Sequence, residues 1–304
     1  PVAVTGVTPT ITEIDKEYAV IHMSYVVESM NDKKSHYYQV DEYYNVTYNR
    51  SSEMVKLLAF DRYQESFFDS GYISKDRNSI SMGVTNDPAE YVTSEDYGIL
   101  AFVRLGQLWM YKYNDSSLTN IFSYPQDSFS DARTLNTNLD INIADMDADG
   151  NIYFVVYGYM NRGEHEGKNG MSLYYYSAEN MTTQELFFVE CDESYDIMKK
   201  ETGRFTYYNA QTNKFYYLLD ETLYEVSLAD MTQTALVEGI PSAKYFVSAN
   251  RKLVAYPNNA EDEQVTAITI QNFETGETYE KTCASGDLLL ALGFVENDLI
   301  YGWG

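Results

Sequence analysis

Cysteine is scarce, and the two that are present give no sign of chemistry. Cys191 and Cys283 each end the last β-prone run of a repeat. Equivalent positions in non-adjacent repeats should lie farther apart than the ~7 Å between Cα atoms that a disulfide spans. Neither cysteine has a CxxC partner or a nearby histidine. We therefore expect two free thiols with no metal-binding or redox role.

Basic residues are also few. The chain of 304 residues has 21 Lys and Arg against 46 Asp and Glu, which gives a net charge of −25. A surface this acidic repels phosphate backbones and anionic lipid head groups, so nucleic acid and direct membrane-surface binding are not expected. Cations, basic proteins and neutral ligands such as sugars stay open as partners.

Long hydrophobic runs and export signals are missing. No stretch approaches the ~18 apolar residues of a transmembrane helix, and no basic-then-apolar signal peptide is present. The chain begins at Pro1 without Met and stops at Gly304, directly after the β-prone run Leu299 to Tyr301. These ends predict a segment excised from a longer protein.

No catalytic motif is present either. The sequence contains no phosphate-binding loop, nucleophile elbow or zinc motif. We therefore predict no catalytic residues, and a role other than catalysis is favoured.

Tyrosine dominates what the sequence does contain. There are 30 Tyr and 14 Phe, and 44% of the residues are hydrophobic, enough for a sizeable core. Tyrosine combines an apolar ring with a polar tip and suits half-buried sheet surfaces. The excess indicates β-sheet more than an aromatic binding platform.

The β-prone runs recur in groups of about four that repeat at roughly 40 residues, the pattern of a β-propeller. Polar turns open the second run of each group, as at Ser94 to Gly98 and Ala249 to Lys252. A β-sandwich would not repeat groups of four, and Tyr195 to Lys200 is the one short helix expected. The polar segment Pro125 to Asn138 is expected to connect two groups. We predict an all-β chain, a single propeller domain over residues 1–304 with six or seven blades of mostly four antiparallel strands.

Several short phrases resemble β-propellers of the TolB and WD-repeat kind. They are the polar turn and strand Asp147 to Phe154, the third-strand runs Leu108 to Tyr111 and Leu223 to Val226, and the turn Phe273 to Thr278. The resemblance covers most of the chain after about Tyr91, and Asp15 to Phe60 less closely. The Trp-Asp dipeptide and Gly-His pair of true WD repeats are absent.

The whole chain is also similar to uncharacterised tyrosine-rich exported proteins of gut Firmicutes. That similarity implies an extracellular or cell-surface location behind a membrane anchor, and we expect a monomer. If the ring closes as in many propellers, the missing strands of the last blade come from Val2 to Val7 or from beyond Gly304.

Asp145, Asp147 and Asp149 followed by Gly150 match the first half of a calcium-binding loop, because oxygen ligands at positions one, three and five suit Ca²⁺. An EF-hand needs Glu at position twelve, where this chain has Val156. An Asp/Gly turn feeding a strand explains the same residues. No other cofactor is expected.

The best functional candidate is the loop from Asn161 to Gly170. It joins the second and third strands of its group, on the face where propellers usually bind ligands, and long loops on rigid scaffolds often carry function. Its candidate ligand-binding residues are Asn161, Arg162, Glu164, His165, Glu166 and Lys168. Glu164 and Glu166 beside His165 could bind a cation or transfer protons. A solvated hairpin loop explains the same sequence.

These features favour a non-catalytic recognition or scaffold module that binds a protein, peptide or glycan on one propeller face. Two alternatives stay open: a glycan-active propeller enzyme, which would need paired carboxylates ~5–10 Å apart, and a calcium-stabilised structural domain.

Overall fold

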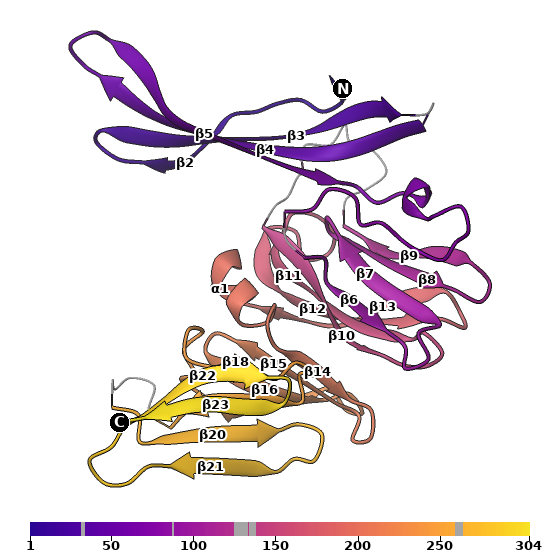
Figure 1. Cartoon of the computed structure of the whole chain (residues 1–304), viewed down its shortest axis with the longest axis vertical. Helices are drawn as coiled ribbons and strands as arrows, with labels where there is room; N and C mark the ends of the chain where they lie inside the picture. Colours follow the sequence, from indigo (N-terminus) through magenta and orange to yellow (C-terminus); the bar gives the residue numbers. More distant parts are fainter. Residues whose placement is uncertain (32–33, 87, 125–132, 134–137, 259–263) are drawn as a thin grey trace. The chain divides into compact units, whose positions relative to one another are not determined.

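The computed structural model describes all of the chain except residues 32–33, 87, 125–132, 134–137 and 259–263 (Figure 1). The chain divides into two compact units, Pro1–Thr137 and Asn138–Gly304. Most of the predicted connection Pro125 to Asn138 lies outside the described residues. None of the described helices is long and apolar enough to cross a membrane.

The first unit contains a five-stranded antiparallel sheet in the order β1-β3-β4-β5, with β2 also paired to β3. Its strands are β1 (Val2–Ala3), β2 (Thr10–Ile14), β3 (Tyr18–Asn31), β4 (Lys34–Asn49) and β5 (Met54–Ser66). Strands of 14, 16 and 13 residues make this sheet unlike the others, whose strands have ten residues or fewer. The expected similarity of Asp15 to Phe60 to an ordinary blade is therefore wrong. The continuous Tyr/Val runs carry no early turn signal, so the strands extend.

The proposed closing segment Val2 to Val7 also has a different partner. Val2 and Ala3 pair with Glu28 and Val27 of β3, and the Val4 amide donates to the Val26 carbonyl. These residues therefore belong to the first sheet and do not complete the last one.

The remaining part of the first unit is a four-stranded sheet preceded by a short 3-10 helix, η1 (Ser70–Tyr72). Its strands are β6 (Tyr91–Thr93), β7 (Ile99–Arg104), β8 (Gln107–Lys112) and β9 (Ser117–Ser123), in sequence order. Phe68 packs against Phe102 and Trp109, with ring centroids 4.7 and 5.4 Å apart. The Arg104 guanidinium, 4% exposed, donates to the Ser66 carbonyl.

The second unit repeats the same up-and-down meander. Its strands are β10 (Leu139–Met146), β11 (Ile152–Met160), β12 (Lys168–Ser177), β13 (Thr182–Glu190), β14 (Thr206–Asn209), β15 (Lys214–Leu219), β16 (Thr222–Ser227), β17 (Thr232–Val237), β18 (Phe246–Val247), β19 (Leu253–Pro257), β20 (Ala267–Asn272), β21 (Thr278–Thr282), β22 (Leu289–Val295) and β23 (Asp298–Trp303). They form three four-stranded sheets and one two-stranded sheet, each in sequence order. Four antiparallel strands joined by short turns are the blade unit of a β-propeller. The predicted all-β propeller class is confirmed, with six sheets among the described residues.

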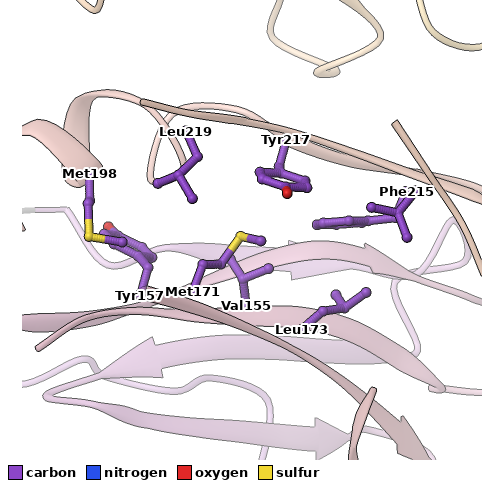
Figure 2. Packing of buried hydrophobic residues seen from close by; sticks show 9 residues of the cluster. Val155, Tyr157, Met171, Leu173, Met198, Phe215, Tyr217 and Leu219 are labelled. Carbon is purple, nitrogen blue, oxygen red and sulfur yellow. The ribbon is translucent and has the colours of Figure 1, made fainter. Parts of the chain in front are cut away.

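The hydrophobic core of the second unit lies between the faces of successive sheets. Val155 and Leu173 from the β10–β13 sheet face Phe215 and Tyr217 from the β14–β17 sheet, all of them fully buried (Figure 2). Met198 adds its side chain from α1 (Tyr195–Lys200), the helix that the sequence predicts. Buried residues follow one another along β11 and β15, which agrees with the near-continuous apolar runs of these strands.

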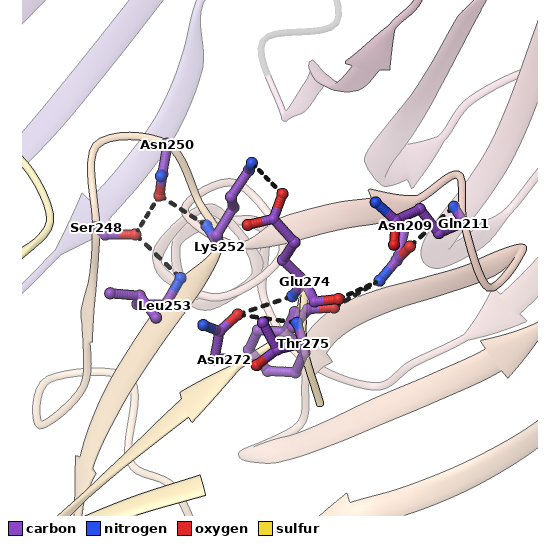
Figure 3. A network of polar contacts seen from close by, with 10 residues as sticks. Asn209, Gln211, Ser248, Asn250, Lys252, Leu253, Asn272, Glu274 and Thr275 are labelled. Atoms are coloured by element: carbon purple, nitrogen blue, oxygen red, sulfur yellow. Dashed lines mark hydrogen bonds and ion pairs between the residues drawn. The ribbon is translucent and has the colours of Figure 1, made fainter. Parts of the chain in front are cut away.

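Polar turns between first and second blade strands are built on one plan. Ser94 and Ser248 each accept, through the hydroxyl oxygen, the amide five residues later, which opens the second strand. Asn209 closes the equivalent turn by accepting the amides of Gln211 and Thr212 (Figure 3). A side-chain oxygen that captures nearby amides is how Asn, Asp and Ser favour turns.

Candidate functional site

The loop between β11 and β12 is anchored by its histidine. His165 Nε2 lies 2.7 Å from Glu185 Oε1 on β13. The imidazole ring stacks on Phe188, with centroids 3.9 Å apart and the planes within 9° of parallel. Both contacts are made to the outermost strand of the same sheet, so they fix the loop against β13.

Glu185 is the centre of this anchor. Its carboxylate also accepts hydrogen bonds from the Tyr174 hydroxyl at 3.0 Å and the Ser172 hydroxyl at 3.3 Å. The side chain is 28% exposed, and a partly desolvated carboxylate needs such donors. Hydrogen bonds to an ionised acceptor are stronger than neutral ones, so the network holds His165 firmly.

The far side of the loop is held by a second set of contacts. Lys168 Nζ lies 2.6 Å from Glu190 Oε2 and 6.0 Å from the centre of the Phe188 ring. Gly170 is necessary here, since a Cβ at this position would come within 2.3 Å of the Val189 carbonyl oxygen. The connection therefore ends at Gly167, earlier than predicted, because Lys168 and Gly170 already belong to β12, which approaches β13 closely at Gly170.

The other predicted loop residues divide into two groups. Arg162 is half-buried, and its Nε lies 3.5 Å from Asn161 Oδ1. Glu164 and Glu166 have exposed side chains. The structure thus holds His165 against β13, whereas Lys168 forms an exposed ion pair with Glu190 and the two glutamates have exposed side chains.

Sequence reasoning missed Glu185, Ser172, Tyr174 and Phe188 as parts of this site. The useful signal was strand register, because Tyr174 and Glu185 are directly opposite each other on β12 and β13. Directly opposed side chains on one face interact, but the bulge between Leu173 and Tyr174 shifts the register.

The Asp145 to Asp149 segment takes the turn conformation. Asp147 Oδ1 accepts the amides of Asp149 and Asn151, at 3.0 and 2.9 Å, and Oδ2 accepts the Asn151 side-chain amide at 2.8 Å. This is the same capture of turn amides seen at Ser94, Ser248 and Asn209. In the described part of the chain, no three His, Cys, Asp or Glu side chains form a group that could hold a metal ion. Calcium binding stays a prediction.

Asp145 has a different environment from Asp147. Burial, together with the nearby Asp147 carboxylate, raises the pKa of Asp145 to about 6, although Lys252 and the Met146 amide oppose the shift. Asp145 pairs with Tyr153 across β10 and β11. A carboxyl with a pKa in this range can exchange a proton near neutral pH.

Tyrosine rings gather beside Asp145, at the edge of the interface between the β10–β13 and β14–β17 sheets. The Tyr153 ring lies between those of Tyr208 and Tyr175, at centroid distances of 3.9 and 4.9 Å. Burial, with the charges of Glu274 and Asp145 nearby, raises the pKa of Tyr207 to about 12. Burial also raises the pKa of Tyr153 and of Tyr175, so these two hydroxyls and that of Tyr207 stay protonated and can donate hydrogen bonds.

A polar network adjoins this group from the later sheets. Lys252 Nζ and Glu274 Oε1 lie 2.5 Å apart, and the Asn209 side-chain amide donates to the carbonyls of Phe273 and Glu274 (Figure 3). Arg251 reaches Asn142 Oδ1 at 2.6 Å, which links the β18–β19 turn to β10. The network joins three successive sheets of the second unit.

Both cysteines are free thiols, and burial raises the pKa of Cys191. A raised pKa lowers the fraction of reactive thiolate.

Comparison with known proteins gives a likeness of fold only. No protein-family model and no curated protein sequence matches the chain. Similar solved structures include TolB from Acinetobacter baumannii, with a TM-score of 0.41, 10% identity, and coverage of 94% of this chain and 77% of that one. Porphyromonas gingivalis dipeptidyl peptidase 4 has a TM-score of 0.42 and 12% identity, and the match covers 90% of this chain. An oligogalacturonate lyase in complex with manganese has a TM-score of 0.31 and 8% identity, and the match covers 90% of this chain and 83% of the lyase chain.

This chain spans only 41% of the length of the peptidase. Identities and scores this low carry no inference about activity, and the propeller class rests on the strand order of the sheets themselves.

Proposed function

We propose that this chain is a non-catalytic recognition module of a bacterial surface protein, exported and tethered to the membrane in its full-length form. Its ligand is a protein, peptide or glycan, and the binding surface is the loop Asn161 to Gly170. The observation that carries the proposal is the anchoring of His165 by Glu185 and Phe188.

Anchoring matters because binding costs free energy when it orders a flexible segment. A loop already fixed in one conformation avoids about 0.5–1.5 kcal/mol for each side chain that would otherwise be immobilised. Glu164 and Glu166 are exposed carboxylates on either side of the anchored histidine. They suit a ligand with cationic or hydroxyl groups, which agrees with the net charge of −25.

The test is a screen of the whole chain against glycan and peptide arrays, followed by affinity measurements on any ligand found. The double variant E164Q/E166Q should lower affinity at least tenfold. His165→Ala should also weaken binding, because the loop would lose its anchor. Glu179→Gln, an exposed carboxylate in the β12–β13 turn of the same sheet, is the matched control and should bind as wild type. Unchanged binding by both loop variants would contradict the proposal.

A glycan-active enzyme is the second candidate, and Asp145 is the observation that favours it. Its raised pKa of about 6 is what a general acid in glycoside cleavage requires. The neighbouring tyrosines supply stacking and hydrogen-bonding groups that suit sugars. Release of reducing ends from polysaccharides by wild type, abolished in Asp145→Asn, would support this reading over the recognition module. No release by wild type across neutral and acidic polysaccharides would reject it.

A further inference from the structure

The short helix α1 contributes to the hydrophobic core of the second unit. Its buried residue, Met198, lies beside Tyr157 in the cluster of Figure 2, and the Tyr195 ring stacks on Tyr157 with centroids 6.1 Å apart. The helix has six residues, and isolated helices shorter than ~12 residues are marginal in water. The helical state of α1 therefore depends on its docking against the sheets.

Glu201, directly after α1, joins this helix to two other segments of the second unit. Its amide donates to the carbonyls of Ile197 and Met198 at 3.1 and 3.2 Å. Its carboxylate accepts the Glu221 amide at 3.2 Å, in the turn between β15 and β16. Its carbonyl accepts the Tyr245 hydroxyl at 3.2 Å, from the connection between β17 and β18. The C-terminal end of α1 is therefore held through this residue.

The surroundings of the Glu201 carboxyl suit its neutral form. The residue is completely buried, and no hydrogen-bond partner is found for Oε2 in the described part of the chain. Burial raises the pKa of Glu201 to about 7, and the charges of Glu193 and Glu221 add to the shift, although the Asp220 and Glu221 amides oppose it. A buried carboxylate with few donors costs free energy that is recovered when the side chain reaches water.

The groups around Glu201 oppose a negative charge at this place. Burial raises the pKa of Cys191 and of Tyr245, so both stay neutral near pH 7. The cations nearest to Glu201 in the chain, Lys199, Lys200 and Arg204, have exposed side chains. Arg204 lies over the Tyr245 ring, 4.8 Å from its centre. The titratable residues that interact with Glu201 itself are Cys191, Glu193, Asp220, Glu221 and Tyr245.

We propose that Glu201 is a pH-sensitive latch, whose ionisation releases α1 from the core cluster of Figure 2 while the sheets of the second unit stay folded. Release takes Met198 out of the cluster and uncovers apolar side chains that pack with it, among them Tyr157, Met171 and Leu219. The latch is closed at acidic pH and opens more readily as the pH rises. It is separate from the loop Asn161 to Gly170 and does not depend on the function proposed for that loop.

Proton linkage gives the direction and the size of the effect. The docked state holds the Glu201 proton up to about pH 7, whereas a released side chain in water has the ordinary value of 4.5. The ratio of released to docked α1 should therefore rise about tenfold for each pH unit between these two values, and level off above them, a total of about 300-fold.

The test is hydrogen exchange of the whole chain between pH 5 and 8, expressed as protection factors that correct for the intrinsic rate at each pH. The amides of Met198, Glu201 and Gly203 are hydrogen-bonded within the α1 segment and report its release. The amides of β11, an inner strand of its sheet, report unfolding of the sheet. We expect protection of the α1 amides to fall about tenfold per pH unit up to pH 7, and to stay at least tenfold below that of β11.

A pair of variants assigns the effect to one carboxyl. Glu201→Gln has the shape of the neutral acid and cannot ionise, so protection of its α1 amides should change less than threefold between pH 5 and 8. At pH 8 it should exceed that of the wild type at least tenfold. Asp192→Asn removes an exposed carboxylate close to α1 and should keep the pH dependence of the wild type.

A second measurement reports whether the core cluster is uncovered. Met198→Cys and, separately, Leu173→Cys are made in a chain whose own two cysteines are replaced by serine. Leu173 is fully buried in the same cluster but lies on β12. Labelling by a thiol reagent, divided by the rate for free cysteine at the same pH, should rise with pH at position 198 and be at least tenfold slower at position 173.

Three outcomes would overturn the proposal. The first is protection of the α1 amides that does not change with pH in the wild type. The second is a Glu201→Gln variant that keeps the wild-type pH dependence. The third is equal protection of α1 and β11, or equal labelling at positions 198 and 173, at every pH. The third outcome would mean that α1 opens only when the whole unit unfolds.

Discussion

Glu201 should make this protein less stable as the pH rises. Its side chain lies directly after α1 and is completely buried. Oε1 accepts the Glu221 amide at 3.2 Å, and no hydrogen-bond partner is found for Oε2. Burial is the main cause that raises the pKa of Glu201 from 4.5 to about 7, and the charges of Glu193 and Glu221 add to it.

The sign follows from proton linkage. Because the folded-state pKa lies above the unfolded value, the folded protein holds this proton more tightly than the unfolded chain does. The contribution to stability is complete below pH 4.5, declines as the pH rises, and is lost above pH 7. At ~1.4 kcal/mol for each pH unit between the two values, ionised Glu201 lowers the free energy of unfolding by about 3 kcal/mol at pH 8.

Glu201→Gln tests this directly, because glutamine has the shape of the neutral acid and can still accept the Glu221 amide. A neutral acceptor makes a weaker hydrogen bond than a carboxylate, so we expect a net gain of about 2 kcal/mol at pH 8. At pH 4 the two proteins should agree within about 0.5 kcal/mol. The measurement is urea unfolding at several pH values, with exposed Asp192→Asn as the control. An equal difference at both pH values, or a variant less stable at pH 8, would refute the reasoning.

Three further predictions concern packing, hydrogen bonding and metal. Gly170→Ala should lower the free energy of unfolding by about 2 kcal/mol or more, because the added Cβ would overlap β13. A Cβ at Gly302 meets nothing within 4 Å, so Gly302→Ala should cost under about 1 kcal/mol. Asn142→Ala should lower the free energy of unfolding by about 2–3 kcal/mol, measured by thermal or urea unfolding, because the fully buried Asn142 amide bridges two carbonyls and a guanidinium. Asn180 is exposed, and Asn180→Ala should change the free energy of unfolding by under about 1 kcal/mol. If calcium binds at the Asp147 turn, a melt with calcium should exceed one with magnesium at matched ionic strength by several degrees, and no difference would reject that site.

Part of the candidate site could be read from the sequence. Three glycines and several charged residues between two apolar runs marked Asn161 to Gly170 as a loop, since glycine and polar residues interrupt strands. Its anchoring could not be read, because Glu185 and Phe188 lie about twenty residues away. The bulge between Leu173 and Tyr174 sets which side chains of β13 face β12.

The sequence by itself determined the strand grouping after about Tyr91, the turn chemistry and the helix Tyr195–Lys200, because these depend on residues close together in the chain. Alternation of apolar and polar residues decides strand against helix, and a Ser, Asp or Asn at a turn captures amides two to five residues away. Only the tertiary structure decided that Asp145 is desolvated and that Glu201 is completely buried. The donors to Asp147 lie two and four residues away in the same turn. The burial that raises the pKa of Asp145 depends on the tertiary packing.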